Sequence, residues 1–161
     1  MLSQCLDSTV IQSFARVQPS EKSSMACQST VELRDLKIET QIGTYGPGDT
    51  VPNAHLLDMF LSIDSNLVLI AKDGMQYVFD YDPLIVEVIR LAGDCHYATQ
   101  ERLMTRIAEA CAMFPEIKAV EIGLRKAPVR AGTGSLGIRL FLDDNELGQL
   151  RKTSPLATDT F

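Results

Sequence analysis

The stretch that most constrains the fold of this chain is Tyr97–Lys126, because it predicts a helix followed at once by a strand. Apolar residues recur every four positions along 103–112 in two adjacent rows, which together make a stripe wide enough to cover a sheet. Thr99 is a suitable N-cap, and Pro115 stops the helix. The segment 119–124 then predicts a strand, so the stretch runs from a helix start to a strand end.

Three side chains in and near this stretch have the chemistry of a site, although each also has a plain structural interpretation. Glu101 falls in the first helical turn, where unpaired backbone N–H groups favour a negative charge, so the pattern alone assigns it to the helix dipole. By the same standard, Lys126 is a solvated lysine at a strand end. Tyr81 is a partly buried ring just before the helix start at Asp82-Pro83.

Charge balance and apolar content limit the classes of protein to which the chain can belong. The 161 residues are enough for one domain with its own core. Lys and Arg number 15 against 21 Asp and Glu, which gives a net charge of −6 and argues against a nucleic-acid partner, because phosphate binding needs clustered cations. No stretch approaches the ~20 apolar residues of a membrane span. The composition therefore predicts a globular domain that binds neither nucleic acid nor a membrane.

The cysteines and histidines predict neither disulfides nor a metal centre. None of the four cysteines forms a C-x-x-C pair, and free thiols are typical of a reducing compartment, so we expect a cytoplasmic protein. Cys95-His96 is the only adjacent Cys/His pair, and the second histidine, His55, lies far away in the sequence. A zinc site needs three or four ligands, so no metal is expected.

The chain divides into three parts. Residues 1–30 are rich in Ser and Gln and lack the continuous apolar segment of a secretory signal, so we expect a flexible leader. Residues 31–142 contain the periodic segments and form the predicted domain. Residues 143–161 are polar and contain a proline, which predicts a partly disordered tail.

The domain shows the element order β-β-α-α-β-β. Strands are expected at 31–42, 55–63, 119–124 and 136–142, and helices at 82–93 and 100–114. The apolar alternation slips between Leu33 and Leu36, which predicts a bulge, and the apolar run 67–71 predicts a further short strand in the connection.

This order predicts an α+β domain, in which a four-stranded antiparallel sheet carries two helices on one face. Such a sheet has open edges, and closing several sheets around an axis pairs them. We therefore expect a ring-shaped homo-oligomer with sites between neighbouring subunits.

Five short strings in this order resemble the dihydroneopterin aldolase family, which has the tunnelling fold, and the resemblance covers about 31–142. They are Thr40–Tyr45 (TQIGTY), Val78–Tyr81 (VFDY), Gln100–Glu109 (QERLMTRIAE), Leu124–Pro128 (LRKAP) and Ser135–Ile138 (SLGI). The resemblance implies a barrel built from ring-shaped tetramers that stack into an octamer.

The resemblance also implies an activity and roles for individual residues. In that family, retro-aldol cleavage of 7,8-dihydroneopterin gives 6-hydroxymethyl-7,8-dihydropterin and glycolaldehyde in folate biosynthesis. The pterin ring is the electron sink, so no cofactor, metal or Schiff base is implied. Glu101 would accept hydrogen bonds from the pterin, Lys126 would act as general acid or base through water, and Tyr81 would relay a proton. Phe79 and Gln100 fall beside these positions and are expected to contact the substrate.

Two departures from the family pattern bear on the reaction. The family carries a Glu five residues beyond the glycine that matches Gly43, whereas this chain has Gly48 there and Asp49 next to it. Asp49 is the candidate for the missing carboxylate, one residue out of register. In addition, Ala127 separates Lys126 from its proline.

These departures leave three functions open. The first is the aldolase, and the second is an epimerase of dihydroneopterin or its phosphate that uses the same retro-aldol intermediate. The third is a non-catalytic pterin-binding protein, which the displaced loop carboxylate supports and the presence of Tyr81, Glu101 and Lys126 opposes. Pyruvoyl-tetrahydropterin synthase and zinc-dependent GTP cyclohydrolase share the tunnelling fold but need metal-binding sets of His or Cys and His, so they are set aside.

Overall fold

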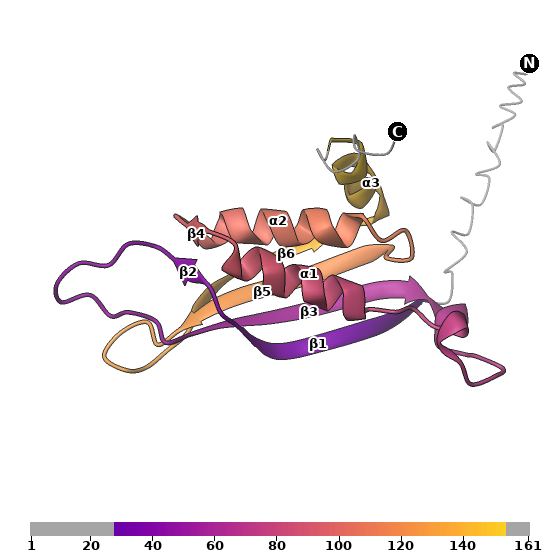
Figure 1. Ribbon diagram of the computed structural model, residues 1–161, viewed down its shortest axis with the longest axis horizontal. Helices are drawn as coiled ribbons and strands as arrows, with labels where there is room; N and C mark the ends of the chain where they lie inside the picture. The colour runs from indigo at the N-terminus through magenta and orange to yellow at the C-terminus, as the bar shows by residue number, and fades with distance from the viewer. Residues whose placement is uncertain (1–27, 154–161) are drawn as a thin grey trace, which may run out of the picture.

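A four-stranded antiparallel sheet forms the centre of the computed structural model, which describes residues 28–153 (Figure 1). Its strands lie in the order β1-β3-β5-β6. They are β1 (Gln28–Ile38), β3 (Ala54–Asp64), β5 (Ala119–Ala127) and β6 (Leu136–Leu142). Residues in β3 alternate between buried and partly exposed, as expected of a strand with one face on the core. The strands predicted at 55–63, 119–124 and 136–142 are confirmed. The strand predicted at 31–42 is confirmed only as far as Ile38, because residues 41–42 form a separate short strand outside this sheet.

Two helices cover one face of this sheet, α1 (Asp82–Gly93) and α2 (Gln100–Ala112) (Figure 1). The Thr99 side chain accepts a hydrogen bond of 3.3 Å from the backbone N–H of Arg102, which confirms the predicted N-cap. The apolar stripe of α2 is buried against the sheet, and the residues 1% exposed or less include Leu57, Leu103, Ile107, Cys111, Ile122 and Leu124. The α+β architecture with both helices on one face is confirmed.

The predicted bulge lies in β1. Pairing with β3 is regular up to Leu33 and resumes at Leu36, so the register shifts between these two residues. Asp35 in the bulge has a φ of 54°, in the left-handed region that single Asp and Asn residues tolerate. The phase slip in the sequence was therefore a correct signal.

A second, small sheet joins two connecting segments. In it β2 (Gln41–Ile42) pairs in parallel with β4 (His96–Tyr97). The backbone N–H of Gly43 adds a bond of 2.8 Å to the carbonyl of Tyr97. The segment that follows β1 is thus held against the segment that precedes α2.

Three predictions about the connections and the ends need correction. The run 67–71 is not a strand: the 3₁₀ helices η1 (Ser65–Leu67) and η2 (Met75–Tyr77) lie in this connection, and Leu69 is 77% exposed. An apolar run with no partner strand cannot form a ladder. At the leader, residues 28–30 belong to β1, and residues 1–27 lie outside the described residues.

The expected tail begins with a third helix, α3 (Asp144–Thr153), which packs beside α2. Asp143 and Glu146 cap its start reciprocally: each side chain accepts a 2.9 Å bond from the backbone N–H of the other. Leu147 is fully buried, and this contact holds α3 on the domain. The rest of the tail lies outside the described residues.

None of the helices in the part of the chain that the structure describes is long and apolar enough to cross a membrane. The outer strands β1 and β6 each pair on one side only within the single chain. The ring-shaped assembly that would pair these edges stays a prediction.

Candidate functional site

Lys126 lies one residue before the end of β5, on the face of the sheet that the helices cover. It follows the alternation of the buried residues Ile122 and Leu124, so its side chain points to the same face. In register it is opposite His55 on β3. Its Nζ atom lies 5.9 Å from the centre of the Tyr45 ring, in the loop after β2. The lysine is therefore partly enclosed rather than fully solvated.

The start of α2 lies at the same end of the molecule as the end of β5, the strand that carries Lys126 (Figure 1). Figure 1 shows β2, β4 and the loop that follows β5 gathered at this end. Glu101 is exposed in the first turn of α2, where the helix dipole favours its charge. The structure thus brings the predicted residues Glu101, Gln100 and Lys126 to one end of the sheet.

Three buried polar atoms without a hydrogen-bond partner lie on the segments that meet there. Across residues 28–153 these are the only buried side-chain N or O atoms left unpaired: Thr40 Oγ1, His55 Nε2 and Gln100 Oε1. Thr40 precedes β2, and Gln100 opens α2 three residues after β4. Buried polar atoms are almost always paired, so a cluster of exceptions calls for a ligand or water. This end of the sheet is therefore our candidate site.

His55 was missed as a site residue because it was weighed only as a metal ligand. It is 7% exposed, and burial together with the nearby Lys126 charge lowers the pKa of its imidazole below 6.5. The imidazole is therefore neutral at pH 7. A signal was present in the sequence, since His55 occupies the buried phase of the alternating strand that continues with Leu57 and Met59.

Asp49, the candidate loop carboxylate, forms a hydrogen bond within its own turn. Its Oδ2 atom accepts a 2.6 Å hydrogen bond from the backbone N–H of Gly46, and its side chain is exposed. The same loop carries Tyr45, whose ring faces Lys126. The loop therefore reaches the candidate site, but its carboxylate closes a turn there.

Tyr81 and Phe79 lie at the other end of α1. Tyr81 is the residue before α1 and is 45% exposed, and the 12 residues of α1 separate it from β4 by about 18 Å at 1.5 Å per residue. Phe79 is buried against Phe114 in an edge-to-face pair with ring centres 6.0 Å apart. Both line a cavity of about 410 Å³ beside η2. A single chain therefore does not bring Tyr81 together with Lys126 and Glu101.

A network of charged and polar groups joins the middle of α2 to the end of α1 and to β4. Arg106 donates to both carboxylate oxygens of Asp94 at 2.7 Å, and this pairing holds the pKa of Asp94 well below its usual range. The Tyr97 hydroxyl donates to the carbonyl of Leu91 at 2.6 Å, and burial raises its pKa to about 12. These bonds tie the end of α1 to β4 and α2, which gives the candidate site a rigid edge.

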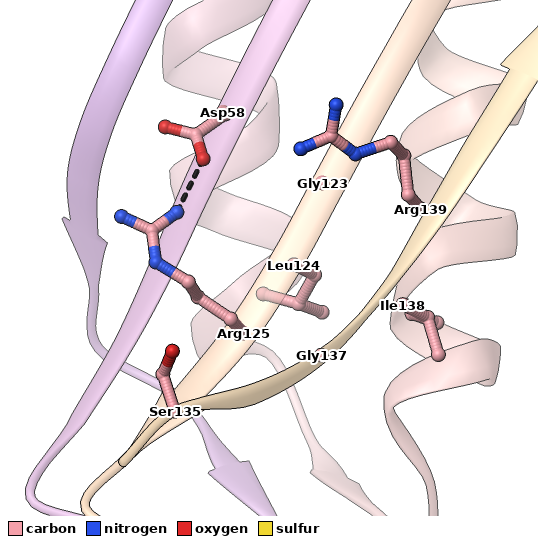
Figure 2. Close-up of a pocket in the computed structure, with 8 residues that line it drawn as sticks. All are labelled: Asp58, Gly123, Leu124, Arg125, Ser135, Gly137, Ile138 and Arg139. Atoms are coloured by element: carbon pink, nitrogen blue, oxygen red, sulfur yellow. Dashed lines mark hydrogen bonds and ion pairs between the residues drawn. The ribbon is translucent and has the colours of Figure 1, made fainter.

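The opposite, helix-free face of the sheet carries a different polar cluster (Figure 2). A cavity of about 190 Å³ there is lined by Asp58, Arg125, Ser135 and neighbouring residues, and by none of the predicted site residues. Arg125 pairs with Asp58 and with Asp35. Its charges are matched within the chain, unlike the polar atoms on the other face.

Between residues 28 and 153, no three His, Cys, Asp or Glu side chains are grouped so that they could hold a metal ion. The side chains gathered at the candidate site are instead a lysine, a neutral histidine, a carboxylate, and amide and hydroxyl groups. This set can accept hydrogen bonds from a polar ligand and transfer protons.

Comparison with known proteins places the chain among related sequences and folds. The family model for dihydroneopterin aldolase matches residues 31–141. No curated protein sequence matches the chain significantly.

Three solved structures share the fold. A dihydroneopterin aldolase from Burkholderia thailendensis bound to guanine has a TM-score of 0.61 and 21% identity, over 72% of this chain and 91% of that one. A putative dihydroneopterin aldolase from Vibrio cholerae has a TM-score of 0.61 and 18% identity, over 71% and 97%. The Escherichia coli dihydroneopterin aldolase in complex with neopterin has a TM-score of 0.60 and 22% identity, over 71% and 98%. The described domain therefore has the tunnelling fold of these proteins.

Proposed function

Because the chain belongs to the dihydroneopterin aldolase family, we propose that it is a lyase that cleaves 7,8-dihydroneopterin by a retro-aldol reaction. The products are 6-hydroxymethyl-7,8-dihydropterin and glycolaldehyde. The observation that carries this proposal is the group of unpaired buried polar atoms on the segments that converge beside Lys126 and the start of α2. A polar heterocycle bound there would supply the missing partners.

Glu101 is the proposed anchor of the pterin ring. Two of the related structures hold neopterin and guanine, which share an edge with an amino group and a ring N–H. A carboxylate can accept both hydrogen bonds at once, and charge-assisted bonds of this kind are about twice as strong as neutral ones. The helix dipole at the first turn of α2 stabilises the negative charge of Glu101 before the ligand binds. Gln100 lies beside it with a free amide oxygen that can accept a further bond.

Lys126 is the proposed general acid and base. In the cleavage step the hydroxyl on the second side-chain carbon loses its proton, the bond between the first two side-chain carbons breaks, and glycolaldehyde leaves. The electron pair enters the dihydropterin ring system, and the first side-chain carbon then gains a proton. An amine held beside the ring can move both protons through water, and its position at the strand end gives it access to the substrate side chain.

The proposed site is completed by a second subunit. Tyr81 is at the far end of α1 from Lys126, so its proposed role as proton relay requires the Tyr81 of a neighbouring copy. The exposed ring of Tyr81 and the open edges of β1 and β6 support such an arrangement. We propose a ring-shaped homo-tetramer or a stacked octamer.

An epimerase is the second candidate, and Asp49 is the observation that favours it. Its carboxylate closes the turn with Gly46, so the loop of this chain offers no free carboxylate in the described state. A site with one proton carrier fewer would protonate the first side-chain carbon of the intermediate more slowly, which gives glycolaldehyde time to recombine with it. Recombination with the opposite stereochemistry inverts the hydroxyl without net cleavage.

The test is incubation of the pure protein with 7,8-dihydroneopterin, followed by oxidation and chromatography of the fluorescent pterins. 6-Hydroxymethylpterin formed together with glycolaldehyde is the expected result. Formation of the epimer alone would replace the aldolase by the epimerase. Unchanged substrate, with tight binding of neopterin in a fluorescence titration, would leave a non-catalytic pterin-binding protein.

Mixing of two inactive variants tests the shared site. Lys126→Met and Tyr81→Phe subunits are each expected to lose most activity. If one site combines Lys126 of one subunit with Tyr81 of the next, co-refolded mixtures regain up to about a quarter of the activity, because one interface in four is then intact in a random mixture. No gain above the two separate variants would mean that Tyr81 of a neighbouring copy does not complete the Lys126 site.

A further inference from the structure

His55 is exceptional among the polar side chains of the described residues. Only His55 and Ser65 are polar residues in the buried class, and His55 is 7% exposed. Its Nε2 atom is buried and has no hydrogen-bond partner. An imidazole is large and polar, so leaving one nitrogen unpaired in the interior costs stability. The position therefore needs a reason other than packing.

The sheet register places His55 directly opposite Lys126. Cross-strand neighbours of this kind have Cβ atoms about 5 Å apart, and both side chains are on the helix-covered face. On its other side His55 pairs with the apolar Ile38 of β1. On α2, Gln100 carries no charge, and Glu101 is exposed. Lys126 is the charged group that acts on His55.

We propose that His55 is a positioning residue for Lys126: when substrate is bound, the lysine ammonium donates a hydrogen bond to the Nε2 atom of the neutral imidazole, which is unpaired without substrate, and is thereby aimed at the substrate. A lysine has four rotatable bonds and loses much freedom when it is fixed, whereas the buried imidazole is already held. The proposal rests on the proposed function, because it gives His55 a task only if Lys126 moves protons.

Acid switches this arrangement off. Burial and the Lys126 charge both lower the pKa of His55 from 6.5, so the imidazole is neutral at pH 7 and becomes protonated only below 6.5. An imidazolium has no lone pair and repels the ammonium beside it. Turnover should therefore fall as the pH falls through the pKa of His55.

The first test does not depend on activity. The chain has only two histidines, so NMR can follow the titration of both rings, and His96 serves as the internal control. In the Lys126→Met variant the pKa of His55 should rise toward 6.5. An unchanged His55 titration would show that the two side chains do not interact and would overturn the proposal, whatever the protein does to pterins.

The second test compares pH profiles of turnover between about pH 5 and pH 8. His55→Gln keeps a neutral acceptor at every pH, so its turnover should stay flat toward acid, whereas wild-type turnover declines. His96→Gln is the matched control: its amide can still donate to the carbonyl of Gly43, which lies 2.8 Å from His96 Nε2. This control should keep the wild-type acid limb.

His55→Leu keeps the volume and removes the acceptor. It should lower turnover about tenfold at neutral pH with little change in KM, the scale of one lost hydrogen bond to a charged group. An acid limb that persists in His55→Gln, or full turnover in a folded His55→Leu variant, would overturn the positioning role. Absence of turnover in the wild type would instead reject the proposed function, and the NMR titration would still decide whether His55 and Lys126 are coupled.

Discussion

Arg125 and Lys126 are neighbours in the chain, yet they point to opposite faces of β5 and differ in how their charges are used. On the helix-free face Arg125 pairs with Asp58 and Asp35, and Figure 2 shows the first of these ion pairs. On the helix-covered face Lys126 forms no ion pair within the described residues. It faces the ring of Tyr45 and the unpaired imidazole of His55.

The difference separates a structural cluster from a candidate site. Around Arg125 each charge that leaves water gains a partner, so the cluster can hold β3, β5 and the bulge of β1 in register. On the helix-covered face, His55 opposite Lys126 has an unpaired buried nitrogen, and Thr40 and Gln100, on segments at the same end of the sheet, each have an unpaired buried oxygen. Each such atom costs about 1–3 kcal/mol of stability. A folded chain keeps such a cost where a ligand will remove it. Charged side chains that are paired within the chain therefore indicate a structural role for the helix-free face. Buried polar atoms without partners indicate a binding site on the helix-covered face.

Lys126→Met tests the helix-covered face, where we expect a loss of turnover without a loss of stability. Turnover of 7,8-dihydroneopterin should fall a hundredfold or more, because a general acid and base is lost. Affinity for the pterin and the free energy of unfolding should change little, since Lys126 makes no ion pair within the chain. Steady-state kinetics, neopterin titration and chemical unfolding measure the three quantities. A loss of less than threefold would make Lys126 a surface lysine.

Glu101→Gln should weaken pterin binding about thirtyfold. Glutamine keeps the size of the side chain but offers one neutral acceptor in place of a carboxylate that accepts two charge-assisted bonds, which together are worth about 2 kcal/mol. Fluorescence titration with neopterin measures the change. Glu109→Gln, on the same helix, is the control and should bind normally. Equal affinity in the two variants would return Glu101 to a purely structural role at the helix start.

Arg125→Met should show the opposite pattern and destabilise the fold without loss of turnover. It leaves Asp58 unpaired with its side chain only 19% exposed, so we expect a loss of about 2 kcal/mol in the free energy of unfolding. A second change, Asp58→Asn in the Arg125→Met background, removes the unpaired charge and should restore part of this loss. Chemical unfolding measures both variants at one protein concentration.

Turnover per folded subunit should remain close to wild type in Arg125→Met. A fall comparable with that of Lys126→Met would show that the helix-free face takes part in the reaction, and the contrast between the two faces would then be wrong.

Much of the fold could be predicted because its signals are local. The stripe of α2, its cap Thr99 and the bulge after Leu33 each follow from spacing along a few residues. The helix α3 was missed although Asp143 and Glu146 have the spacing of a reciprocal cap, because the polar composition of the segment was weighed above that signal. The prediction of a strand at 67–71 was wrong because a strand also needs a partner strand, which composition does not reveal.

The candidate site was less accessible from the sequence, for two physical reasons. Glu101 and Lys126 lie in short strings that resemble a known family, and their common end of the sheet follows from the topology. Tyr81 lies about one helix length away, and a contact between subunits leaves no trace in the periodicity of a single chain. His55 was weighed only as a metal ligand: its place in the buried phase of the strand was visible in the sequence, but its position opposite Lys126 and its unpaired nitrogen follow only from the strand register.

Arg151 tests whether an arginine whose donors are matched within the chain also has a structural role outside the region that the family model matches. Arg151 lies on α3, outside residues 31–141, and donates to the carbonyls of Ala112 at 2.6 Å and Ile117 at 3.2 Å. These carbonyls lie at and after the end of α2, where a helix leaves acceptors unpaired and favours a cation. Arg151→Met should therefore lower the free energy of unfolding by about 1 kcal/mol and leave turnover unchanged. Lys152→Met, one residue on and exposed, is the control and should have no measurable effect. Equal stability of the two variants would mean that the apolar contacts of Leu147 and Leu150 hold α3, because the guanidinium bonds would then add nothing that water does not supply.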